Sequence, residues 1–208
     1  MSLFDISKRV LDILIAVVAM VILSPVLVVI WIAIKLSSEG PVIFRQQRAG
    51  RNRRPFVFYK FRTMKQDAEP FGPSPKSGRD PRLTEVGKFL REYSLDELPQ
   101  LFNVLKGDMS IVGPRPLYIS QIPEWNERQK KRLLVKPGLT GLAQITGRGE
   151  LTREEKLDFD VKYVETSSLL TDIRIILATI AYVFKRKNIY EKSYSETEYT
   201  RGQSKHGT

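Results

Sequence analysis

The strongest hydrophobic pattern in the sequence is an apolar run near the N-terminus, residues 13–34, which contains no charged side chain. At about 1.5 Å per residue, a helix of this length can cross a hydrocarbon layer of about 30 Å. The run is too long for a signal peptide, and no small-x-small cleavage site ends it. The pattern therefore predicts a membrane helix.

Ser24 and Pro25 interrupt this run near its middle. Pro25 has no N–H to donate to the carbonyl of Val21, and Ser24 can bond a carbonyl one turn back. Because both effects bend helices, we expect a kink. A sharp kink would give a re-entrant hairpin within one leaflet, but many spanning helices tolerate a proline, so the pattern leaves both topologies open.

Basic residues flank the run unequally. Only Lys8 and Arg9 precede it, and a larger group follows it closely: Lys35, Arg45, Arg48, Arg51, Arg53 and Arg54. The positive-inside rule therefore places the domain after the run in the cytoplasm, whereas two cations do not fix the side of the N-terminus.

After residue 36, short patterns alternate with turn signals, which is typical of a small α+β domain. Two β-prone runs, 41–44 and 56–59, enclose an Arg/Gly/Asn-rich turn and predict a β-hairpin. Helices are predicted at 83–91, 99–106, 118–134 and 157–164, and loops are predicted at 67–81, 113–116, 136–141 and after 190. Gly107 is placed to end the second of these helices, and Pro123 interrupts or starts the third.

A second apolar run, 173–184, is too short to span a membrane. Its basic end at 185–187 is typical of an interfacial helix against anionic headgroups. A core helix with a cationic C-terminus fits the pattern equally well. The basic run 130–132 is most simply a solvated face.

Composition narrows the possible chemistry. The 208 residues carry 34 Lys and Arg against 23 Asp and Glu, and this net charge of +11 suits a polyanionic partner such as nucleic acid, anionic lipid or a phosphorylated substrate. The absence of cysteine excludes disulfides and thiol chemistry, and the single histidine, His206, leaves no basis for a His-based triad or metal site. Common glycine-rich nucleotide motifs are missing too.

Two adjacent carboxylates, Asp96 and Glu97, have two interpretations. In one, Ser94 and Glu97 form a capping box at a helix start. In the other, the acids act on a phosphorylated ligand at the N-terminus of a helix that Pro99 begins. Adjacent helical residues point about 100° apart, so the two acids would take different roles and not share a proton.

A carboxylate that attacks a diphosphate needs the diphosphate charge to be neutralised. Mg²⁺ held by Asp96 would do this, and arginine forks would add to the effect. The arginines available in short motifs are Arg62, Arg82, Arg91 and Arg115.

At this point the chain resembles the bacterial sugar transferase family, the monotopic phosphoglycosyl transferases. The motifs occur in the family's order and extend over nearly the whole chain. They are Gly40-Pro-Val-Ile-Phe44, Tyr59-Lys-Phe-Arg-Thr-Met64, Asp80-Pro-Arg-Leu-Thr84, Leu90-Arg91, Ser94-Leu-Asp-Glu-Leu-Pro-Gln100, Asn103-Val-Leu-Lys-Gly-Asp-Met-Ser110, Val112-Gly-Pro-Arg-Pro116, and Lys136-Pro-Gly-Leu-Thr-Gly141 with Gln144. The chain is most similar to the small, bacillosaminyl-type members, which lack further transmembrane helices.

The resemblance implies transfer of a phospho-sugar from a UDP-sugar to polyprenyl (undecaprenyl) phosphate, which gives polyprenyl-diphosphate-sugar and UMP as the first membrane step of glycan assembly. Asp96 would be the nucleophile that carries a covalent phospho-sugar beside Mg²⁺, and Glu97 would assist protonation or the metal. Phosphate and uridine contacts would come from motif residues: Lys60, Arg62, Arg82, Arg91, Pro114, Arg115 and Pro116.

The resemblance also implies a placement in the membrane. Ser24 and Pro25 match the break of a re-entrant helix, which would put both chain ends on the cytoplasmic face of the bacterial inner membrane. Lys8, Arg9 and Asp12 match positions beside that helix, where the cations would be available to the lipid phosphate. The chain would then comprise a re-entrant helix with an N-terminal interfacial segment (1–36), a cytoplasmic catalytic domain with interfacial helices (37–190) and a polar tail (191–208).

Some points stay open. By analogy to small members the sugar would be an N-acetylated amino sugar, and the 67–81 loop is a plausible place for sugar contacts. A membrane-anchored polyanion-binding protein without catalysis would suit the charge, but it needs basic clusters with interleaved aromatics, of which 45–58 is a weak version. We expect no nucleic acid partner. A transferase that passes the phospho-sugar directly to the lipid could use the same residues. The oligomeric state is not specified.

Overall fold

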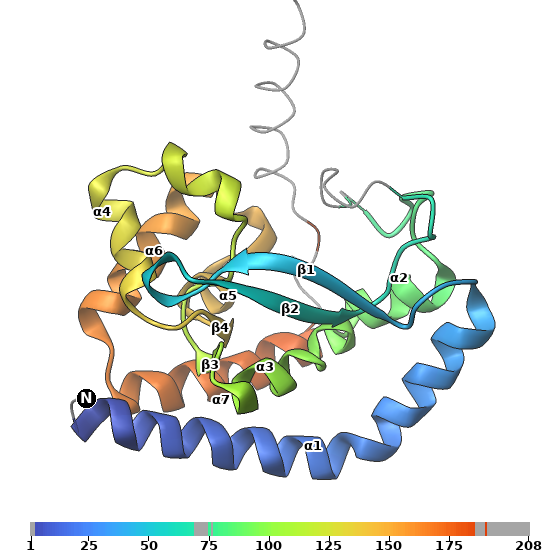
Figure 1. Cartoon of the computed structure of the whole chain (residues 1–208), viewed down its shortest axis with the longest axis horizontal. Helices are drawn as coiled ribbons and strands as arrows, with labels where there is room; N and C mark the ends of the chain where they lie inside the picture. Colours follow the sequence, from blue (N-terminus) through green and yellow to red (C-terminus); the bar gives the residue numbers. More distant parts are fainter. Residues whose placement is uncertain (1–2, 69–74, 76, 186–189, 191–208) are drawn as a thin grey trace, which may run out of the picture.

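The computed structural model describes residues 3–68, 75, 77–185 and 190. Helix α1 (Leu3–Ser37) runs along one edge of the molecule, and the other elements pack on one side of it (Figure 1). Residues 69–74 and 76 of the predicted loop 67–81 lie outside the described residues, as do the basic residues 186–187 and the predicted tail 191–208.

Helix α1 has 35 residues and extends beyond the apolar run at both ends. Its ribbon bends in the C-terminal part (Figure 1), and the helix contains Pro25. The Oγ of Ser24 donates to the carbonyl of Val21 at 2.8 Å, so the predicted kink and its serine contact are confirmed. Among the described residues, α1 is the one helix long and apolar enough to cross a membrane, and 11% of its most apolar window is buried.

The predicted hairpin is confirmed, with longer strands than expected. Strands β1 (Ile43–Ala49) and β2 (Pro55–Phe61) pair antiparallel, with Gln46 opposite Phe58. The turn between them places Asn52 and Arg53 at positive φ. The strands extend beyond the apolar runs because polar residues such as Gln46 continue the backbone pairing.

Two helices and a 3-10 turn follow the hairpin. Helix α2 (Glu85–Glu92) is capped by Thr84, whose side chain accepts from the backbone N–H of Gly87 at 2.8 Å. A 3-10 turn, η2 (Leu95–Glu97), leads to α3 (Gln100–Lys106). Gly107 ends α3 at φ 92, in the left-handed conformation that favours glycine, as the sequence predicted.

The middle of the chain differs from the prediction. Strand β4 (Gly138–Thr140) lies where a loop was predicted and pairs parallel with β3 (Ser110–Val112). The predicted helix 118–134 is instead three short pieces, and the prediction was wrong because Pro123 lies within the first piece and Asn126 caps the second. These pieces are η3 (Ile119–Glu124), α4 (Glu127–Lys130) and η4 (Lys131–Leu134).

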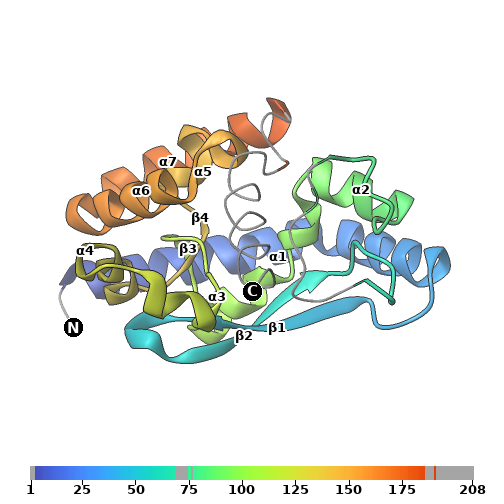
Figure 2. The same ribbon diagram turned by 90° about the horizontal axis from the view of Figure 1, so that it is seen from above.

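The C-terminal part is helical, and in Figure 2 it lies beside the β3–β4 pair, on the opposite side of the molecule from the hairpin. Its elements are α5 (Leu142–Thr146), η5 (Arg148–Glu150), α6 (Arg153–Thr166) and α7 (Leu169–Lys185). On α7, Ile175 and Asp172 are buried while Leu170 and Leu177 are exposed. The helix therefore has a core face, as one interpretation of residues 173–184 predicts, and an exposed apolar face. The interfacial role of the exposed face stays a prediction.

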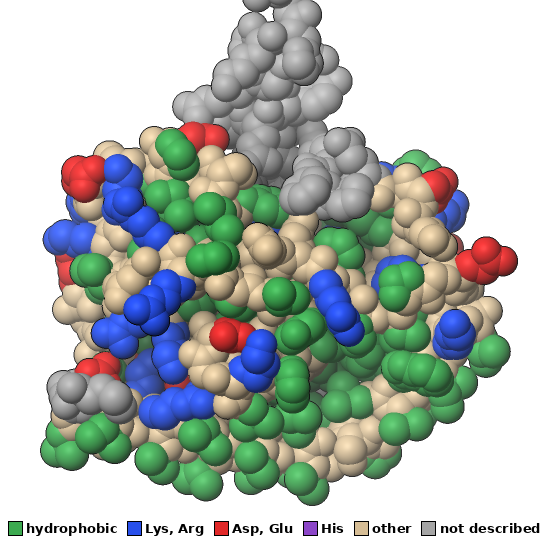
Figure 3. Space-filling view, viewed as in Figure 1, with side chains coloured by type: hydrophobic (Ala, Val, Ile, Leu, Met, Phe, Trp, Pro, Cys, Tyr) green, Lys and Arg blue, Asp and Glu red, His purple; other side chains and the backbone are tan. Residues whose placement is uncertain are grey.

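One main core joins the two halves of the chain. Phe56 and Phe58 of β2 pack with Val104 of α3, Tyr163 of α6 and Ile175 of α7. A second cluster joins the C-terminal part of α1 to β2 and α2. Large apolar side chains nevertheless remain exposed along α1, and they form the green lower margin in Figure 3.

Polar contacts fix the N-terminal part of α1 to this core. Lys8 forms an ion pair with Asp172 at 2.6 Å, and Arg9 donates to the last carbonyls of α3. The carboxylate of Asp12 accepts from the backbone N–H of Ile111 at 2.9 Å. In this structure the three side chains predicted beside the lipid phosphate therefore hold α1 to the domain.

Gly87 is the tightest glycine position in α2. A Cβ there would lie 2.0 Å from the backbone carbonyl oxygen of Thr63, which cannot move cheaply. We expect Gly87→Ala to lower the free energy of unfolding by about 3 kcal/mol because the helix must shift away from Thr63, in the segment after β2. Urea unfolding measures this. Glu85→Ala, on the exposed side of the same turn, should change stability by about 0.5 kcal/mol or less. Equal stabilities for the two variants would contradict the packing argument.

Candidate active site

The acid pair lies in the 3-10 turn directly before α3. Asp96 is 4% exposed, and its Oδ2 lies 2.6 Å from the Nζ of Lys60 on β2. The Oε1 of Glu97 lies 2.7 Å from Nη2 of Arg115, in the segment after β3. Each carboxylate therefore has its own cation, and the expectation that the two acids do not share a proton agrees with this geometry.

The predicted capping box does not form. Ser94 has φ 58, in the left-handed region, and its side chain makes no capping hydrogen bond. A capping serine needs extended backbone, so this conformation turns its hydroxyl away. The Oγ of Ser94 instead accepts from Nη2 of Arg148 at 2.9 Å, and Glu97 reaches Arg115. The local S-x-x-E spacing was thus a misleading signal, because both side chains form hydrogen bonds with residues distant in the sequence.

The charges around Glu97 decide its protonation. Burial alone would raise the pKa of Glu97, but the neighbouring Arg115, Lys60 and Arg148 lower it to about 2. Burial lowers the pKa of the Lys60 ammonium, although Asp96 acts in the opposite direction. Glu97 is therefore ionised over the whole physiological range of pH.

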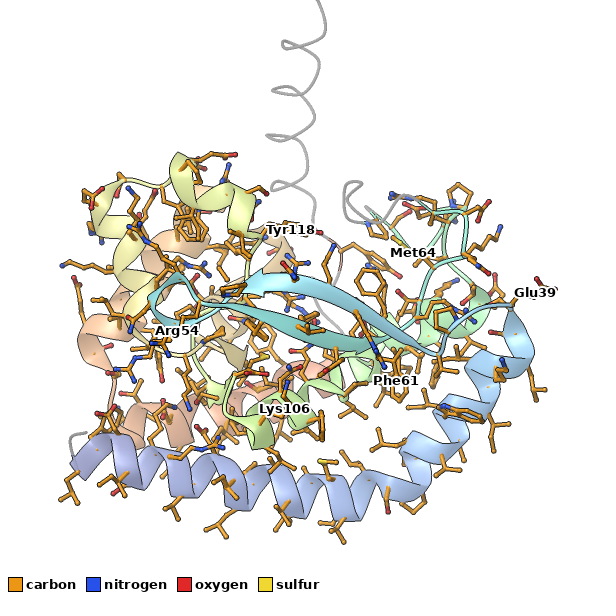
Figure 4. All side chains as sticks on the ribbon, in the orientation of Figure 1. Glu39, Arg54, Phe61, Met64, Lys106 and Tyr118 are labelled. Carbon is orange, nitrogen blue, oxygen red and sulfur yellow. The ribbon has the colours of Figure 1, made fainter. Side chains whose placement is uncertain are left out.

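A cavity of about 440 Å³ opens over the acid pair, a volume typical of small-molecule sites. Asp96, Glu97 and Lys60 line it, together with residues of the hairpin, η3, α5 and α6. Tyr118 and Met64, which also line the cavity, lie on the side of the hairpin away from α1 (Figure 4). The cavity is rich in cations, as a site for a phosphorylated ligand requires.

The structure brings several predicted residues together at this cavity. Lys60, Arg91, Arg115 and Pro116 all line it. The Nε of Arg91 donates to the hydroxyl of Thr63 at 2.9 Å, which fixes the start of its guanidinium. Pro114 does not line the cavity, and its backbone carbonyl accepts from the N–H of Gly138 instead.

Other predicted residues lie apart from the acid pair or have structural partners. Arg62 lines the cavity, but its guanidinium donates to the carbonyls of Ser38 and Glu39 at the end of α1. Arg82 does not line the cavity and pairs with Asp80 at 2.7 Å. The predicted α1 residues do not line it either; these are Lys8, Arg9, Asp12, Ser24 and Pro25.

Sequence reasoning missed Arg148. It lines the cavity, holds Ser94 and is one of the charges that lower the pKa of Glu97. Its backbone has φ 52, a strained conformation for a non-glycine residue that is often found at functional sites. The flanking glycines in Gly147-Arg-Gly149 were the available signal, since they mark an irregular backbone.

The interpretation of 130–132 as a solvated face was wrong for Arg132. Its side chain is 2% exposed and donates from Nε and Nη2 to Oδ2 of Asp160, at 3.0 and 2.7 Å. Nη2 also donates to the backbone carbonyl of Arg115. No local pattern pairs residues 132 and 160, so only the three-dimensional structure reveals this contact.

No group of three or more His, Cys, Asp or Glu side chains in the described part of the chain is placed to hold a metal ion alone. Mg²⁺ in phosphate-transfer sites usually takes one or two protein carboxylates and completes its shell with phosphate oxygens and water. Asp96 and Glu97 supply oxygen ligands of this kind at the cavity wall. The donor set therefore fits a Mg²⁺ ion that arrives with a diphosphate.

Comparison with known proteins agrees with the geometry. A galactosyl transferase, CpsE, of Streptococcus agalactiae is 45% identical over 191 residues, which cover 86% of this chain and 42% of that protein. A UDP-glucose:undecaprenyl-phosphate glucose-1-phosphate transferase of Escherichia coli is 44% identical over 88% of this chain and 41% of its own length. The chain thus spans about two fifths of these two relatives.

A relative of similar length is an uncharacterized sugar transferase, EpsL, of Bacillus subtilis. It is 39% identical over 92% of this chain and 94% of its own length. The family model described as "Bacterial sugar transferase" matches residues 3–186. The match includes α1, the hairpin and the acid pair, and the chain therefore belongs to the bacterial sugar transferase family.

Proposed function

We propose that this chain transfers a sugar 1-phosphate from a UDP-sugar to undecaprenyl phosphate. The single observation that carries the proposal is the Asp96–Glu97 pair, in which each carboxylate pairs with its own cation at the wall of a cavity. The relatives from Escherichia coli and Klebsiella pneumoniae, whose names state this reaction with UDP-glucose, support it. A non-catalytic polyanion-binding protein has no use for two carboxylates at the centre of a cationic cavity.

Asp96 is the proposed catalytic nucleophile. One of its oxygens attacks the β-phosphorus of the UDP-sugar, and the bond from that phosphorus to the bridging oxygen breaks, so UMP leaves with the electron pair. An oxygen of the lipid phosphate then attacks the same phosphorus, and the Asp96–phosphorus bond breaks. This gives polyprenyl-diphosphate-sugar and restores the carboxylate. One cavity thus serves both substrates in turn.

The cations around the acid pair suit this sequence of charges. Lys60 neutralises the free Asp96 carboxylate, and it faces the transferred phosphate once Asp96 is esterified. Arg91, Arg115 and Arg148 line the same cavity and would bind the diphosphate oxygens. Mg²⁺ bound through Asp96 would neutralise diphosphate charge when present.

We further propose that α1 is re-entrant and that the protein is monotopic on the cytoplasmic face of the membrane. Support comes from both ends of α1, which contact the same domain: Lys8 and Asp12 at one end, and the carbonyls held by Arg62 at the other. A domain on one side of a bilayer can bind both ends only if the helix returns to that side. The bend at Pro25 allows the return.

Single cysteines test this topology, because the native chain has none. We expect cysteines at Ser2 and at the exposed Glu127 to react with an impermeant maleimide from the same, cytoplasmic side of sealed inverted vesicles. Labelling efficiency in intact and opened vesicles is the measurement. Labelling of Ser2→Cys from the opposite side to Glu127→Cys would contradict the re-entrant helix.

Intact-mass measurement tests the covalent step. The purified protein is incubated with Mg²⁺ and a panel of UDP-sugars without lipid, and we expect a phospho-sugar adduct on the peptide that contains Asp96. Asp96→Asn should form no adduct and should lower turnover by roughly a thousandfold or more, because the nucleophile is lost. Asp108→Asn, which removes a carboxylate outside the cavity, is the control.

Two outcomes would contradict this mechanism. Lipid product without any adduct on the wild-type chain would favour direct transfer of the phospho-sugar to the lipid. Normal turnover by folded Asp96→Asn would remove Asp96 from the nucleophile role. The panel must include UDP-glucose, UDP-galactose and UDP-N-acetylated amino sugars, since the bacillosaminyl-type resemblance predicts an amino sugar whereas the names of the relatives specify glucose or galactose.

A further inference from the structure

Helix α6 presents a polar face to the cavity. Arg153, Lys156, Leu157 and Asp160 all line the cavity, and their spacing of three, four and seven residues puts them on one face. A helix that only supported the core would direct apolar residues inward at these positions. Three of these four residues are charged instead, and none of them has a role in the proposed phosphoryl transfer.

Asp160 is the most deeply buried charged residue on this face, at 3% exposed. Arg132 donates twice to a single oxygen of the carboxylate, Oδ2. The other oxygen, Oδ1, is buried and accepts no hydrogen bond from any described residue. Burial also raises the pKa of the Asp160 carboxyl against the opposing effect of Arg132.

A buried carboxylate oxygen without a donor is costly, and such atoms usually have a partner in the working molecule. In the ionised form, which the ion pair with Arg132 favours, Oδ1 is an acceptor only, so the missing partner must be a donor. A phosphate oxygen is excluded by charge repulsion. A hydroxyl group is the donor that a nucleotide-sugar carries in number, both on the ribose and on the sugar.

The position of Asp160 suits a contact beside the diphosphate. Arg132 joins Asp160 to the backbone carbonyl of Arg115, and the side chain of Arg115 pairs with Glu97. The hydroxyl acceptor and the proposed phosphate-binding arginine are therefore held by one chain of hydrogen bonds. A ligand with hydroxyls next to its diphosphate would engage both.

We propose that Oδ1 of Asp160 accepts a hydrogen bond from a substrate hydroxyl, so that the α6 face of the cavity is a polyol subsite. The hydroxyl belongs either to the ribose or to the transferred sugar. This inference rests on the proposed function, since it assumes a nucleotide-sugar in the cavity. It assigns to Asp160 a role in binding that neither Asp96 nor Glu97 fills.

A cycle of variants and deoxy ligands tests the contact. Calorimetry measures how tightly the wild type and Asp160→Asn bind UMP, 2′-deoxy-UMP and 3′-deoxy-UMP. The rate of UMP release measures how the same two proteins react with the accepted UDP-sugar and with its deoxy-sugar analogues. One of the deoxy ligands should bind or react about tenfold more weakly in the wild type, and this penalty should largely vanish in Asp160→Asn. A deoxyribose effect assigns the hydroxyl to the nucleotide, and a deoxy-sugar effect assigns it to the sugar.

Two further variants guard against a folding artefact. Asp158→Asn removes an exposed carboxylate from the same helix, which pairs with Arg128, and it should keep the full deoxy penalty. Arg132→Met with Asp160→Leu replaces the buried ion pair by apolar side chains of similar volume, which proteins often tolerate. This double variant should lose the deoxy penalty just as Asp160→Asn does, while thermal unfolding reports whether each variant is folded.

The outcomes separate this inference from the proposed function. The polyol subsite would be overturned if removal of each hydroxyl weakened binding or reaction equally in the wild type, Asp160→Asn and the double variant. Oδ1 of Asp160 would give this result if its hydrogen-bond partner were water. If the loss of a ribose hydroxyl weakens UMP binding only when Asp160 is present, but the protein transfers nothing to lipid, the proposed function alone would be contradicted. If the protein transfers the phospho-sugar to lipid but no hydroxyl effect depends on Asp160, the subsite alone would be contradicted.

Discussion

The site depends on the neutralisation of two adjacent carboxylates, the buried Asp96 and the part-buried Glu97. An unpaired charge in such a position is strongly unfavourable, so Asp96 and Glu97 each require a cation from elsewhere in the chain. Lys60 comes from the hairpin and Arg115 from the segment after β3. The two ion pairs therefore hold the hairpin, the turn before α3 and the β3 segment together around one cavity, and the same cations suit the binding of a diphosphate.

The attachment of α1 fixes the most apolar surface of the protein relative to this cavity. Apolar side chains on the outer face of α1 are exposed, while Asp12 and Ala16 on its inner face are buried against the domain. The helix is thus part of the domain's core and also its most apolar surface. In the proposed re-entrant placement, a helix held to the domain in this way would bring the cavity to the level of the headgroups, where a lipid phosphate is found.

The sequence predicted those features that depend on local pattern, and it failed where distant residues decide the outcome. The kink at Pro25, the hairpin and the end of α3 at Gly107 follow from proline, turn and glycine chemistry. The predicted capping box was wrong because the side chain of Ser94 accepts a hydrogen bond from Arg148 and that of Glu97 accepts one from Arg115. Strand β4 is too short for a periodic signal, and the buried role of Arg132 depends on Asp160. The family motifs pointed to Lys60, Asp96 and Arg115 but not to the α6 face.

The central claim is that fixed cations hold the Glu97 carboxylate ionised beside Asp96. Carbon-13 labelling of glutamate carboxyls, with Glu97→Gln for assignment, measures this by nuclear magnetic resonance as a function of pH. Burial favours the neutral acid, but Arg115, Lys60 and Arg148 outweigh it, so Glu97 should titrate with a pKa of about 2, and Arg115→Met should raise that pKa. A Glu97 carboxyl that titrates in the ordinary glutamate range in the wild type, and does not respond to Arg115→Met, would contradict the account.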